Sequence, residues 1–318
     1  MREIDASKVV CSVVVPLFNE QEVIGETYKR LTGVMEGEGL PYELVFVNDG
    51  SRDATEELAR VICAKDSRVK LVNFARNFGH QTAISAGMDM TSGQCVVVID
   101  ADLQDPPEVI PEMLARWKEG YDVVYGRRIS REGETFFKKF TAKMFYRTLN
   151  KMTDTEIPVD TGDFRLIDRK VCDALKFGIH EHNRYVRGIV SWLGFRTCPV
   201  EFHREKRFAG TTKYPLKKML KLAEDALLSF SVKPLKWAAG AGIFLCAASL
   251  IYLITALILG ICGALTHTGL LFAILCVALF FNGITLIAVG ILGSYTGRAY
   301  EEAKDRPLYV IRDKVNFD

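Results

Sequence analysis

Charged residues are missing from one long stretch of this chain. Between Trp237 and Gly297 the sequence has no Asp, Glu, Lys or Arg. One membrane crossing needs ~20 apolar residues, so residues 237–297 are long enough for two, and the polar Thr266–Gly269 lies near their middle. The alternative, a buried helical hairpin in a soluble core, would have shorter helices with a polar face. We therefore expect two transmembrane helices, at about 238–261 and 270–295.

Several motifs are absent as well. The eight cysteines are scattered and form no CxxC pair, which predicts free thiols in a reducing compartment rather than a zinc site or a disulfide framework. Neither GxxxxGK[ST] nor GxGxxG occurs, so the P-loop and dinucleotide-binding classes are excluded. The net charge of +2 gives no sign of a polyanionic partner, and we expect no binding to nucleic acid.

The basic residues predict how the two helices are oriented. The segment that connects the helices has no basic residue, whereas both flanks do. By the positive-inside rule, both termini lie in the cytoplasm. The N-terminal residues show no basic-then-apolar signal segment, which agrees. The flanking basic residues are Lys217, Lys218, Lys221, Lys233 and Lys236 before the first helix, and Arg298, Lys304, Arg306 and Arg312 after the second.

Strand and helix patterns alternate through the first part of the chain. Short apolar, β-branched runs predict strands at 9–15, 43–48, 69–74, 95–99 and 122–125, with helices at 20–36, 53–65, 80–91 and 107–118. This alternation predicts an α/β fold with a largely parallel sheet. We expect a cytoplasmic domain at 1–214, an amphipathic juxtamembrane segment at 215–236, the two membrane helices at 237–297 and a cytoplasmic C-terminal tail at 298–318.

Carboxylates follow two of the predicted strands. Asp49 comes directly after one strand, and Asp100 and Asp102 come after another. In parallel sheets, ligands bind beyond the carboxyl ends of the strands. Asp102, the amide of Gln104 and Asp100 offer the hard oxygens that Mg²⁺ or Mn²⁺ takes together with phosphate, so a phosphorylated substrate is implied; a polar turn is the alternative. Asp53 and Asp105 are expected to be helix N-caps.

The order and spacing of several motifs resemble those of one enzyme family. Together with the two C-terminal apolar segments, they resemble the inverting GT-A glycosyltransferases that act on polyprenyl phosphates, of the bactoprenol glucosyltransferase type and, more distantly, the dolichol-phosphate mannose synthases. The resemblance covers nearly the whole chain and implies a Rossmann-like GT-A domain. The motifs are Val15–Glu20, Asn48–Ser51, Arg76–His80, Asp100–Asp102, Gly126–Arg128, Thr161–Leu166 and Arg207–Tyr214.

The resemblance implies a role for each matching residue. A metal ion, Mg²⁺ or Mn²⁺, held by Asp102, Gln104 and Asp100 would neutralise the diphosphate leaving group. The residues that it implies for binding the nucleotide sugar, with UDP-glucose as the expected donor, are Pro16, Asn19, Glu20, Asp49, Asn77, Gly79 and Asp100.

Asp163 corresponds to the carboxylate often proposed as catalytic base, and Asp160 is the second candidate. The structural alternative for Asp163 is a salt bridge to Arg165 or Arg169. A lipid phosphate, however, has a second pKa near about 6 and is largely dianionic at pH 7, so it needs no base. It needs cations that offset the repulsion between the phosphate and the anionic sugar donor and that position the phosphate for in-line attack. The candidates are Arg127, Arg128, Lys138, Lys139, Arg207 and Lys213.

Two segments suit a membrane surface. Thr135–Thr153 mixes aromatic and basic residues without an acid, and Pro215–Trp237 repeats that pattern. A basic helix with aromatic anchors lies on an anionic bilayer, although a core-packing helix with a solvated face is the alternative for 135–153. Asn282, inside the second span, is placed to join neighbouring protomers, so we expect a homo-oligomer such as a tetramer.

The resulting interpretation is a multi-pass enzyme of the bacterial inner membrane that transfers glucose to undecaprenyl phosphate for cell-envelope glycan modification. Galactose, mannose, N-acetylhexosamine or aminoarabinose donors are alternatives with the same chemistry. A processive polysaccharide synthase would carry a QxxRW motif, which this sequence lacks. Two rivals belong to other classes: an inactive membrane scaffold, which the Asp100/Asp102 pair argues against, and a nucleotide-binding transporter, for which two spans offer no evident pathway.

Overall fold

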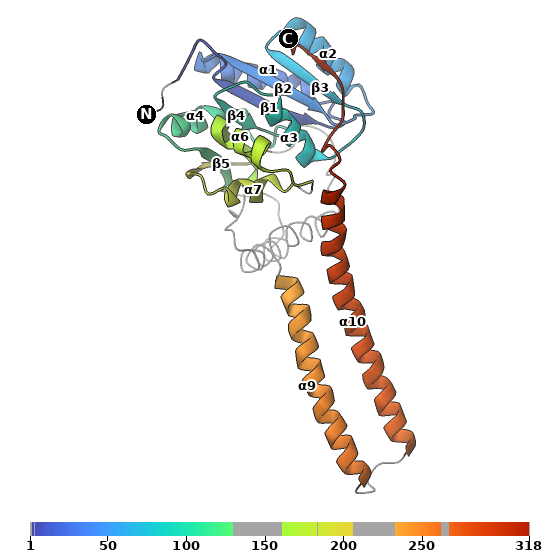
Figure 1. Ribbon diagram of the computed structural model, residues 1–318. Coiled ribbons are helices and arrows are strands. Elements are labelled where there is room, and N and C mark those ends of the chain that lie inside the picture. The colour runs from blue at the N-terminus through green and yellow to red at the C-terminus, as the bar shows by residue number, and fades with distance from the viewer. Residues whose placement is uncertain are drawn as a thin grey trace.

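A computed structural model describes residues 2, 4–129, 161–182, 184–205, 233–261 and 267–317 of the chain. One α/β domain carries a pair of long C-terminal helices (Figure 1). The strands are β1 (Cys11–Leu17), β2 (Tyr42–Asn48), β3 (Val69–Phe74), β4 (Cys95–Val98), β5 (Val123–Arg128), β6 (Thr161–Asp168), β7 (Thr197–Phe202) and β8 (Ile311–Val315). The helices are α1 (Ile24–Glu38), α2 (Thr55–Lys65), α3 (His80–Asp89), a 3₁₀ turn η1 (Pro107–Val109), α4 (Ile110–Lys118), α6 (Arg169–Gly178), α7 (Val186–Trp192), α9 (Lys233–Ile261) and α10 (His267–Ala303).

The strands form one mixed sheet in the order β7-β5-β6-β4-β1-β2-β3-β8. The β1–β2, β1–β4, β2–β3 and β5–β7 pairs are parallel, whereas β6 and β8 run antiparallel to their neighbours. The expectation of an α/β fold with a largely parallel sheet is confirmed. β1 continues past its expected end at Val15 and pairs with β2 as far as Leu17. Its pairing with β4 ends at Val14, two residues before Pro16, which has no N–H to donate.

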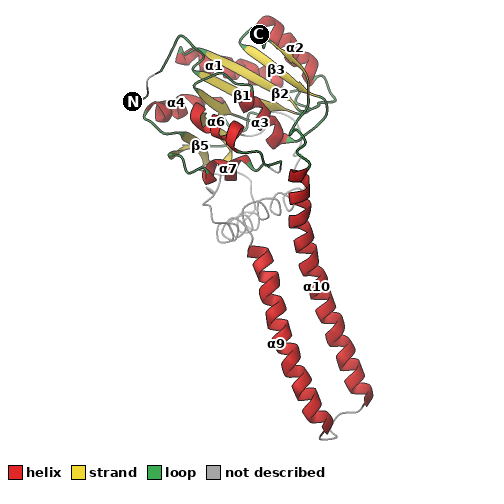
Figure 2. Ribbon diagram, in the orientation of Figure 1, coloured by secondary structure: helices red, strands yellow, loops and turns green. Residues whose placement is uncertain are grey.

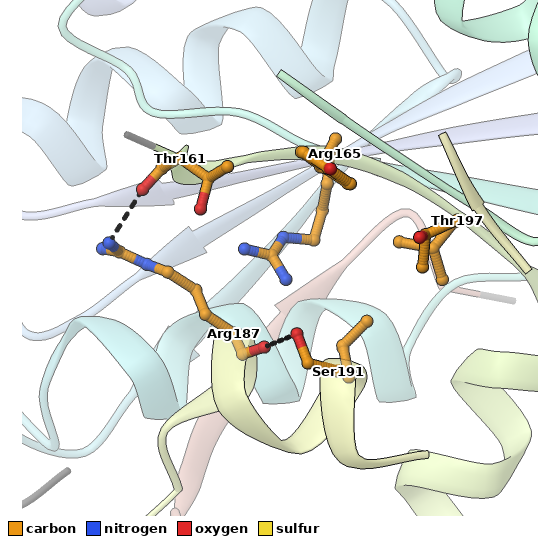
Figure 3. A pocket seen from close by; sticks show the side chains of 8 residues that line it. Thr161, Arg165, Arg187, Ser191 and Thr197 are labelled. Atoms are coloured by element: carbon orange, nitrogen blue, oxygen red, sulfur yellow. Dashed lines mark hydrogen bonds between the residues drawn. The ribbon is translucent and has the colours of Figure 1, made fainter. Parts of the chain in front are cut away.

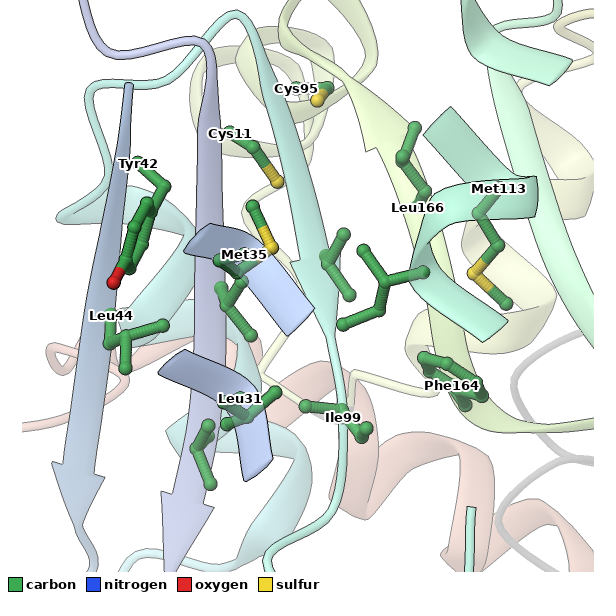
Figure 4. Packing of buried hydrophobic residues seen from close by; sticks show 14 of the residues in the cluster. Cys11, Leu31, Met35, Tyr42, Leu44, Cys95, Ile99, Met113, Phe164 and Leu166 are labelled. Carbon is green, nitrogen blue, oxygen red and sulfur yellow. The ribbon is translucent and has the colours of Figure 1, made fainter. Parts of the chain in front are cut away.

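Helices cover both faces of the sheet (Figure 2). On one face α1 buries Leu31 and Met35, and α4 buries Met113, against alternate strand residues (Figure 4). α2 covers the same face through Ala59 and Cys63. On the other face α3, α6 and α7 pack on the remaining strand residues. Strands buried on both faces read as continuous apolar runs, which explains why β1 to β4 are visible in the sequence.

The two long helices carry the uncharged stretch. Each contains a segment long and apolar enough to cross a membrane, Leu235–Tyr252 in α9 and Phe280–Ala303 in α10, and neither segment is buried by protein. The helices contact each other and extend away from the sheet as a hairpin (Figure 1). Apolar side chains such as Ile243, Phe244 and Leu286 are exposed on them, as expected where lipid takes the place of a protein core.

The C-terminal residues return to the sheet, although the sequence predicts only a tail there. After α10, β8 pairs with β3 and places Asp313 within hydrogen-bond distance of Asn73 Nδ2, at 3.0 Å. Tyr309 stacks on Phe74, with ring centroids 5.3 Å apart, and its hydroxyl donates to Asp89 at 3.0 Å. The segment expected to be a tail therefore joins the second apolar helix to the edge of the α/β sheet.

Candidate active site

The carboxyl ends of three adjacent parallel strands meet at one edge of the sheet. Pro16, Asn19 and Glu20 lie at the end of β1, Asp49 follows β2, and Asp100 and Asp102 follow β4. Parallel neighbours deliver their C-terminal loops to the same side. The structure therefore brings these sequence-predicted residues to one edge, from different parts of the chain.

The loops after β1 and β2 hold each other by hydrogen bonds. Asn19 adopts a left-handed backbone with φ 54°, which Asn tolerates better than most residues. Its N–H donates to Ser51 Oγ at 3.0 Å, and its Oδ1 accepts from the Arg52 N–H at 2.8 Å. The N–H of Glu20 donates to Thr55 Oγ1 at 2.8 Å. Asn19 thus fixes the shape of the crevice that it was expected to line.

Asp49 is a buried carboxylate held by backbone donors. The N–H of Phe78 donates to Oδ1 at 2.6 Å, and the N–H of Gly79 donates to Oδ2 at 3.0 Å. The amide of Asn77 donates to the Asp49 carbonyl at 3.1 Å. Burial raises the pKa of Asp49 above its ordinary value, although the two N–H donors oppose that rise. The Arg76–Gly79 motif therefore forms the wall beside Asp49.

Gly50 allows this wall to come close. A Cβ on Gly50 would lie 2.7 Å from the backbone atoms Arg76 C and Asn77 N. Gly39 has nearly the same φ, 64° against 66°, but its Cβ would meet nothing within 4 Å. Gly39→Ala should lower the free energy of unfolding by about 1–2 kcal/mol, the cost of a left-handed L-residue. Gly50→Ala should cost clearly more in chemical unfolding, and equal losses would contradict the close approach.

The loop after β4 presents the expected oxygen ligands. Asp102 Oδ1 accepts from the Gln104 N–H at 3.1 Å across Leu103, whose φ is 55°. Asp100 Oδ1 is buried and accepts no hydrogen bond from the described part of the chain, although His80 Nε2 lies 3.4 Å away. Burial raises the pKa of Asp100 to about 6, opposed by His80 and reinforced by the nearby carboxylates.

These oxygens fit a divalent cation. No group of three or more His, Cys, Asp or Glu side chains is arranged to hold a metal among the residues described. Mg²⁺ does not need such a group, because it is commonly held by one or two carboxylates with water and substrate phosphate. A buried acceptor without a hydrogen bond, next to a second carboxylate, is the environment that a bound cation would stabilise.

Asp163 is a buried carboxylate on β6, with four hydrogen bonds from three residues. Arg187 from α7 donates through Nε to Oδ1 at 2.8 Å and through Nη2 to Oδ2 at 3.0 Å. Gln81 Nε2 donates at 3.2 Å, and His80 Nε2 lies 3.3 Å from Oδ2. Burial alone would raise the pKa of Asp163, but the charge of Arg187 and these hydrogen bonds hold it well below its ordinary value.

The structural alternative for Asp163, a salt bridge to Arg165 or Arg169, named the wrong partners. Arg165 donates to the Gly162 carbonyl at 2.9 Å, and Arg169 donates to the Gly93 carbonyl at 2.7 Å. Arg187 was missed, because its position depends on how α7 packs on β6. His80 lies between Asp100 and Asp163, and these two carboxylates outweigh the effect of burial and raise its pKa to about 9.

Three other predicted positions, Asp105, Arg127 and Arg128, have different partners from those expected. Asp105 does not cap the next helix. That helix, η1, has Pro106 as its N-cap residue and no side-chain capping hydrogen bond. The Asp105 carboxylate accepts instead from Arg128 Nη2, at 2.9 and 3.1 Å. Arg127 pairs with Glu201. Asp53 does support the start of α2, by accepting from the Thr55 N–H at 3.1 Å.

Several predicted positions lie outside the described residues. They are Asp160, Lys138, Lys139, Arg207, Lys213, residues 135–153 and residues 215–232.

Comparison with known proteins identifies the family. Residues 12–176 match the model of glycosyl transferase family 2. The chain belongs to this family. A glycosyltransferase of Bacillus subtilis is 55% identical, over 96% of this chain and 94% of its own length. The bactoprenol glucosyl transferase of Shigella phage SfV is 40% identical, over 95% of this chain and 98% of its own.

Solved structures match part of the chain. Glucosyl-3-phosphoglycerate synthase from Mycobacterium tuberculosis, in complex with Mn²⁺, UDP and phosphoglyceric acid, is 20% identical. It matches over 69% of this chain and 76% of its own length, with a TM-score of 0.49. The GT-A architecture predicted for this glycosyltransferase is consistent with the family and with the mixed, mostly parallel sheet.

A pocket of this glycosyltransferase has Arg187 in its wall. It is lined by Tyr125 on β5, Arg165 on β6, Thr197 on β7, and Arg187 and Ser191 on α7. Figure 3 shows Arg187 donating to the Thr161 carbonyl and the Ser191 hydroxyl donating to the Arg187 carbonyl. Burial lowers the pKa of Arg165 to about 10. The hydrogen bonds to the Thr161 carbonyl and to Asp163 fix the Arg187 guanidinium at the wall of this pocket.

Proposed function

We propose that this glycosyltransferase moves glucose from UDP-glucose to undecaprenyl phosphate at the cytoplasmic face of the bacterial inner membrane, with inversion at the sugar carbon. The observation that carries the proposal is the set of carboxylates at the ends of β2 and β4, which includes the buried Asp100 Oδ1 that accepts no hydrogen bond from the described residues. Two apolar helices beside this domain and 40% identity to a bactoprenol glucosyl transferase over 95% of the chain support the lipid acceptor.

The donor would bind along the crevice at the strand ends. Pro16, Asn19, Glu20, Asp49, Asn77, Gly79 and Asp100 are the proposed nucleotide-sugar residues. Asp102, Gln104 and Asp100 would hold Mg²⁺ or Mn²⁺, which supplies charge neutralisation to the diphosphate leaving group. Asp49 would accept a hydrogen bond from the base or ribose.

The acceptor would bind as an anion that is already nucleophilic. Its second pKa is about 6, so the dianion dominates at pH 7 and attack on the sugar carbon needs no proton removal. Asp163 is held ionised by Arg187, which makes it a weak base, so we propose it as a positioning residue. Arg127, Arg128, Lys138, Lys139, Arg207 and Lys213 are the proposed cations for the lipid phosphate, and Asp160 is the second carboxylate candidate.

The enzyme is proposed to be multi-pass and oligomeric. A protease-cleavable tag inserted after His267, where α10 begins, should be cut only from the periplasmic side. Tags at either terminus should be cut only from the cytoplasmic side, because the basic residues flank both helices on that side. A cut pattern with the termini on opposite sides would mean a single crossing. Asn282 in α10 is proposed to contact a neighbouring protomer of a homo-oligomer.

A donor panel tests the proposed function. Purified full-length protein is incubated with undecaprenyl phosphate, Mg²⁺ or Mn²⁺ and one labelled nucleotide sugar at a time, and the lipid product is identified by mass. Glucose transfer from UDP-glucose is expected to exceed transfer from the galactose, mannose, N-acetylhexosamine and aminoarabinose donors. Transfer of another sugar would replace the donor assignment. No metal-dependent transfer or donor hydrolysis with any of them would leave an inactive scaffold as the better account.

A further inference from the structure

The loop after β4 is tied to the residues that follow β7. Arg204 Nη2 donates to Gln104 Oε1 at 2.8 Å, and the N–H of Glu205 donates to the Gln104 carbonyl at 2.9 Å. Arg30 on α1 reinforces the junction, because it pairs with Glu205 at 3.0 Å and with Glu108 at 2.6 Å. Both oxygens of Gln104 therefore accept hydrogen bonds from two consecutive residues.

Arg204 is not needed as the counter-ion of a buried acid. Asp105, the nearest carboxylate, already receives two hydrogen bonds from Arg128 Nη2, at 2.9 and 3.1 Å. Arg204 Nε is farther from Asp105, at 3.7 Å, and its side chain is 34% exposed. Burial, followed by the nearby charge of Arg128, lowers the pKa of Arg204, while the carboxylates of Asp105, Asp102 and Asp100 oppose this. The positive charge of Arg204 therefore interacts with all three carboxylates of the loop after β4 rather than with Asp105 alone.

The contact with Gln104 competes with the proposed cation site. Gln104 Oε1 is the amide oxygen proposed to face Mg²⁺ or Mn²⁺. An amide oxygen has two lone pairs, but a guanidinium and a divalent ion on the same oxygen would repel each other at close range. A cation that takes this oxygen would therefore free the guanidinium. The guanidinium would then lie next to the site of a diphosphate, whose oxygens match its planar pair of N–H donors.

We propose that Arg204 is a diphosphate-binding residue that is stored on Gln104 while the cation site is empty, and that moves to the nucleotide diphosphate when the cation binds. This inference rests on the proposed function. Cation binding alone would break the Arg204–Gln104 hydrogen bond without replacing it, whereas cation plus nucleotide would give Arg204 a new anionic partner. Arg204 would thereby make cation and nucleotide binding cooperative.

Two binding measurements on the full-length protein test the proposal. Mn²⁺ binding without nucleotide is followed by electron paramagnetic resonance of the unbound ion, and UDP binding at saturating Mn²⁺ is followed by calorimetry. Arg204→Gln should bind Mn²⁺ alone several-fold more tightly, because no hydrogen bond has to be broken. The same variant should bind UDP about tenfold more weakly, because one charge-assisted contact is lost. Arg204→Lys keeps the charge without the fork and should fall between the two for UDP.

Arg116→Gln is the matched control, because Arg116 is a surface residue of α4 whose guanidinium pairs with Glu119, at the end of the same helix, at 3.3 Å. It should change neither affinity, and thermal unfolding checks that every variant is folded. Weaker Mn²⁺ binding by Arg204→Gln would overturn the proposal, since Arg204 would then orient Gln104 for the metal. Unchanged UDP affinity would also overturn it. Absence of Mn²⁺-dependent UDP binding in the unmodified protein would instead reject the proposed function, and this inference with it.

Discussion

Asp102→Asn is expected to lower sugar transfer by at least about 100-fold while the protein remains folded. The Asn side chain can still accept the hydrogen bond from the Gln104 N–H, which Asp102 Oδ1 accepts at 3.1 Å, so the shape of the loop is kept. The negative charge toward the proposed cation is lost. Stabilisation of a leaving group by a metal is worth several kcal/mol, and each 1.36 kcal/mol is about tenfold in rate. Asp102→Ala should abolish transfer, because the loop hydrogen bond is lost as well.

The measurement for Asp102 is the rate of lipid-linked sugar formation over a titration of Mg²⁺ or Mn²⁺. Asp173→Asn is a matched control, because Asp173 is a surface carboxylate of α6 that lies 4.0 Å from Arg169. This control should keep the unmodified rate. Near-normal transfer by Asp102→Asn at saturating metal would contradict the assignment of Asp102 as a ligand.

Asp163→Asn is expected to lose a large part of the transfer rate without changing the pH at which the rate falls. The dianionic form of the acceptor phosphate increases as pH rises through about 6, so the rate should rise through that pH and level off above it. Asp163 is ionised throughout this range, because its pKa is held well below the ordinary value by Arg187 and His80. The titration of Asp163 therefore cannot produce an acidic limb near pH 6 in the profile of rate against pH.

The two roles of Asp163 predict different pH profiles in single-turnover experiments. A limb near pH 6 that persists in Asp163→Asn excludes Asp163 as its source. Because burial also raises the pKa of Asp100 to about 6, the limb is assigned to the phosphate only if it stays in place when the metal concentration is raised, since a bound cation would lower the pKa of Asp100. A limb that disappears, with a loss of about 10²–10⁴-fold, would restore Asp163 as the base. If Asp163 acts by holding Arg187, the double variant Asp163→Asn/Arg187→Gln should be scarcely slower than Asp163→Asn, because residues that act together are not additive. Thermal unfolding must accompany these rates, since breaking a buried ion pair costs about 3–5 kcal/mol.

The central strands could be read from the sequence because each is a short run of mostly apolar residues. β3 was predicted at its observed bounds, and β2 and β4 within one residue at either end. β6 was recognised only as a motif, because Asp163 and Arg165 place charged side chains on its buried face. β8 has three consecutive charged residues between two apolar ones, and charged side chains are common on the edge strands of sheets. Its partner β3 lies more than 200 residues earlier, and no local pattern reports such a pairing.

The part of the candidate site that lies at the ends of the parallel strands could be predicted from the sequence. Asp49, Asp100 and Asp102 could be placed together because they end strands that share an edge of the sheet. Arg187 and Arg204 could not, since α7 and the residues after β7 reach the site only through tertiary packing. Asp105 fitted the pattern of an N-cap, but its burial beside Arg128 gave it a different role.

The nucleotide released during transfer tests the central claim most directly. The protein is incubated with UDP-glucose labelled in both the uridine and the sugar, together with undecaprenyl phosphate, and both products are identified. Attack of the lipid phosphate on the sugar carbon releases UDP and forms a lipid with one phosphate between the prenyl chain and the glucose. The account predicts UDP and this lipid in equal amounts, with the sugar in the β configuration. Release of UMP with a lipid that carries a diphosphate-linked sugar, or retention of the α configuration, would contradict it.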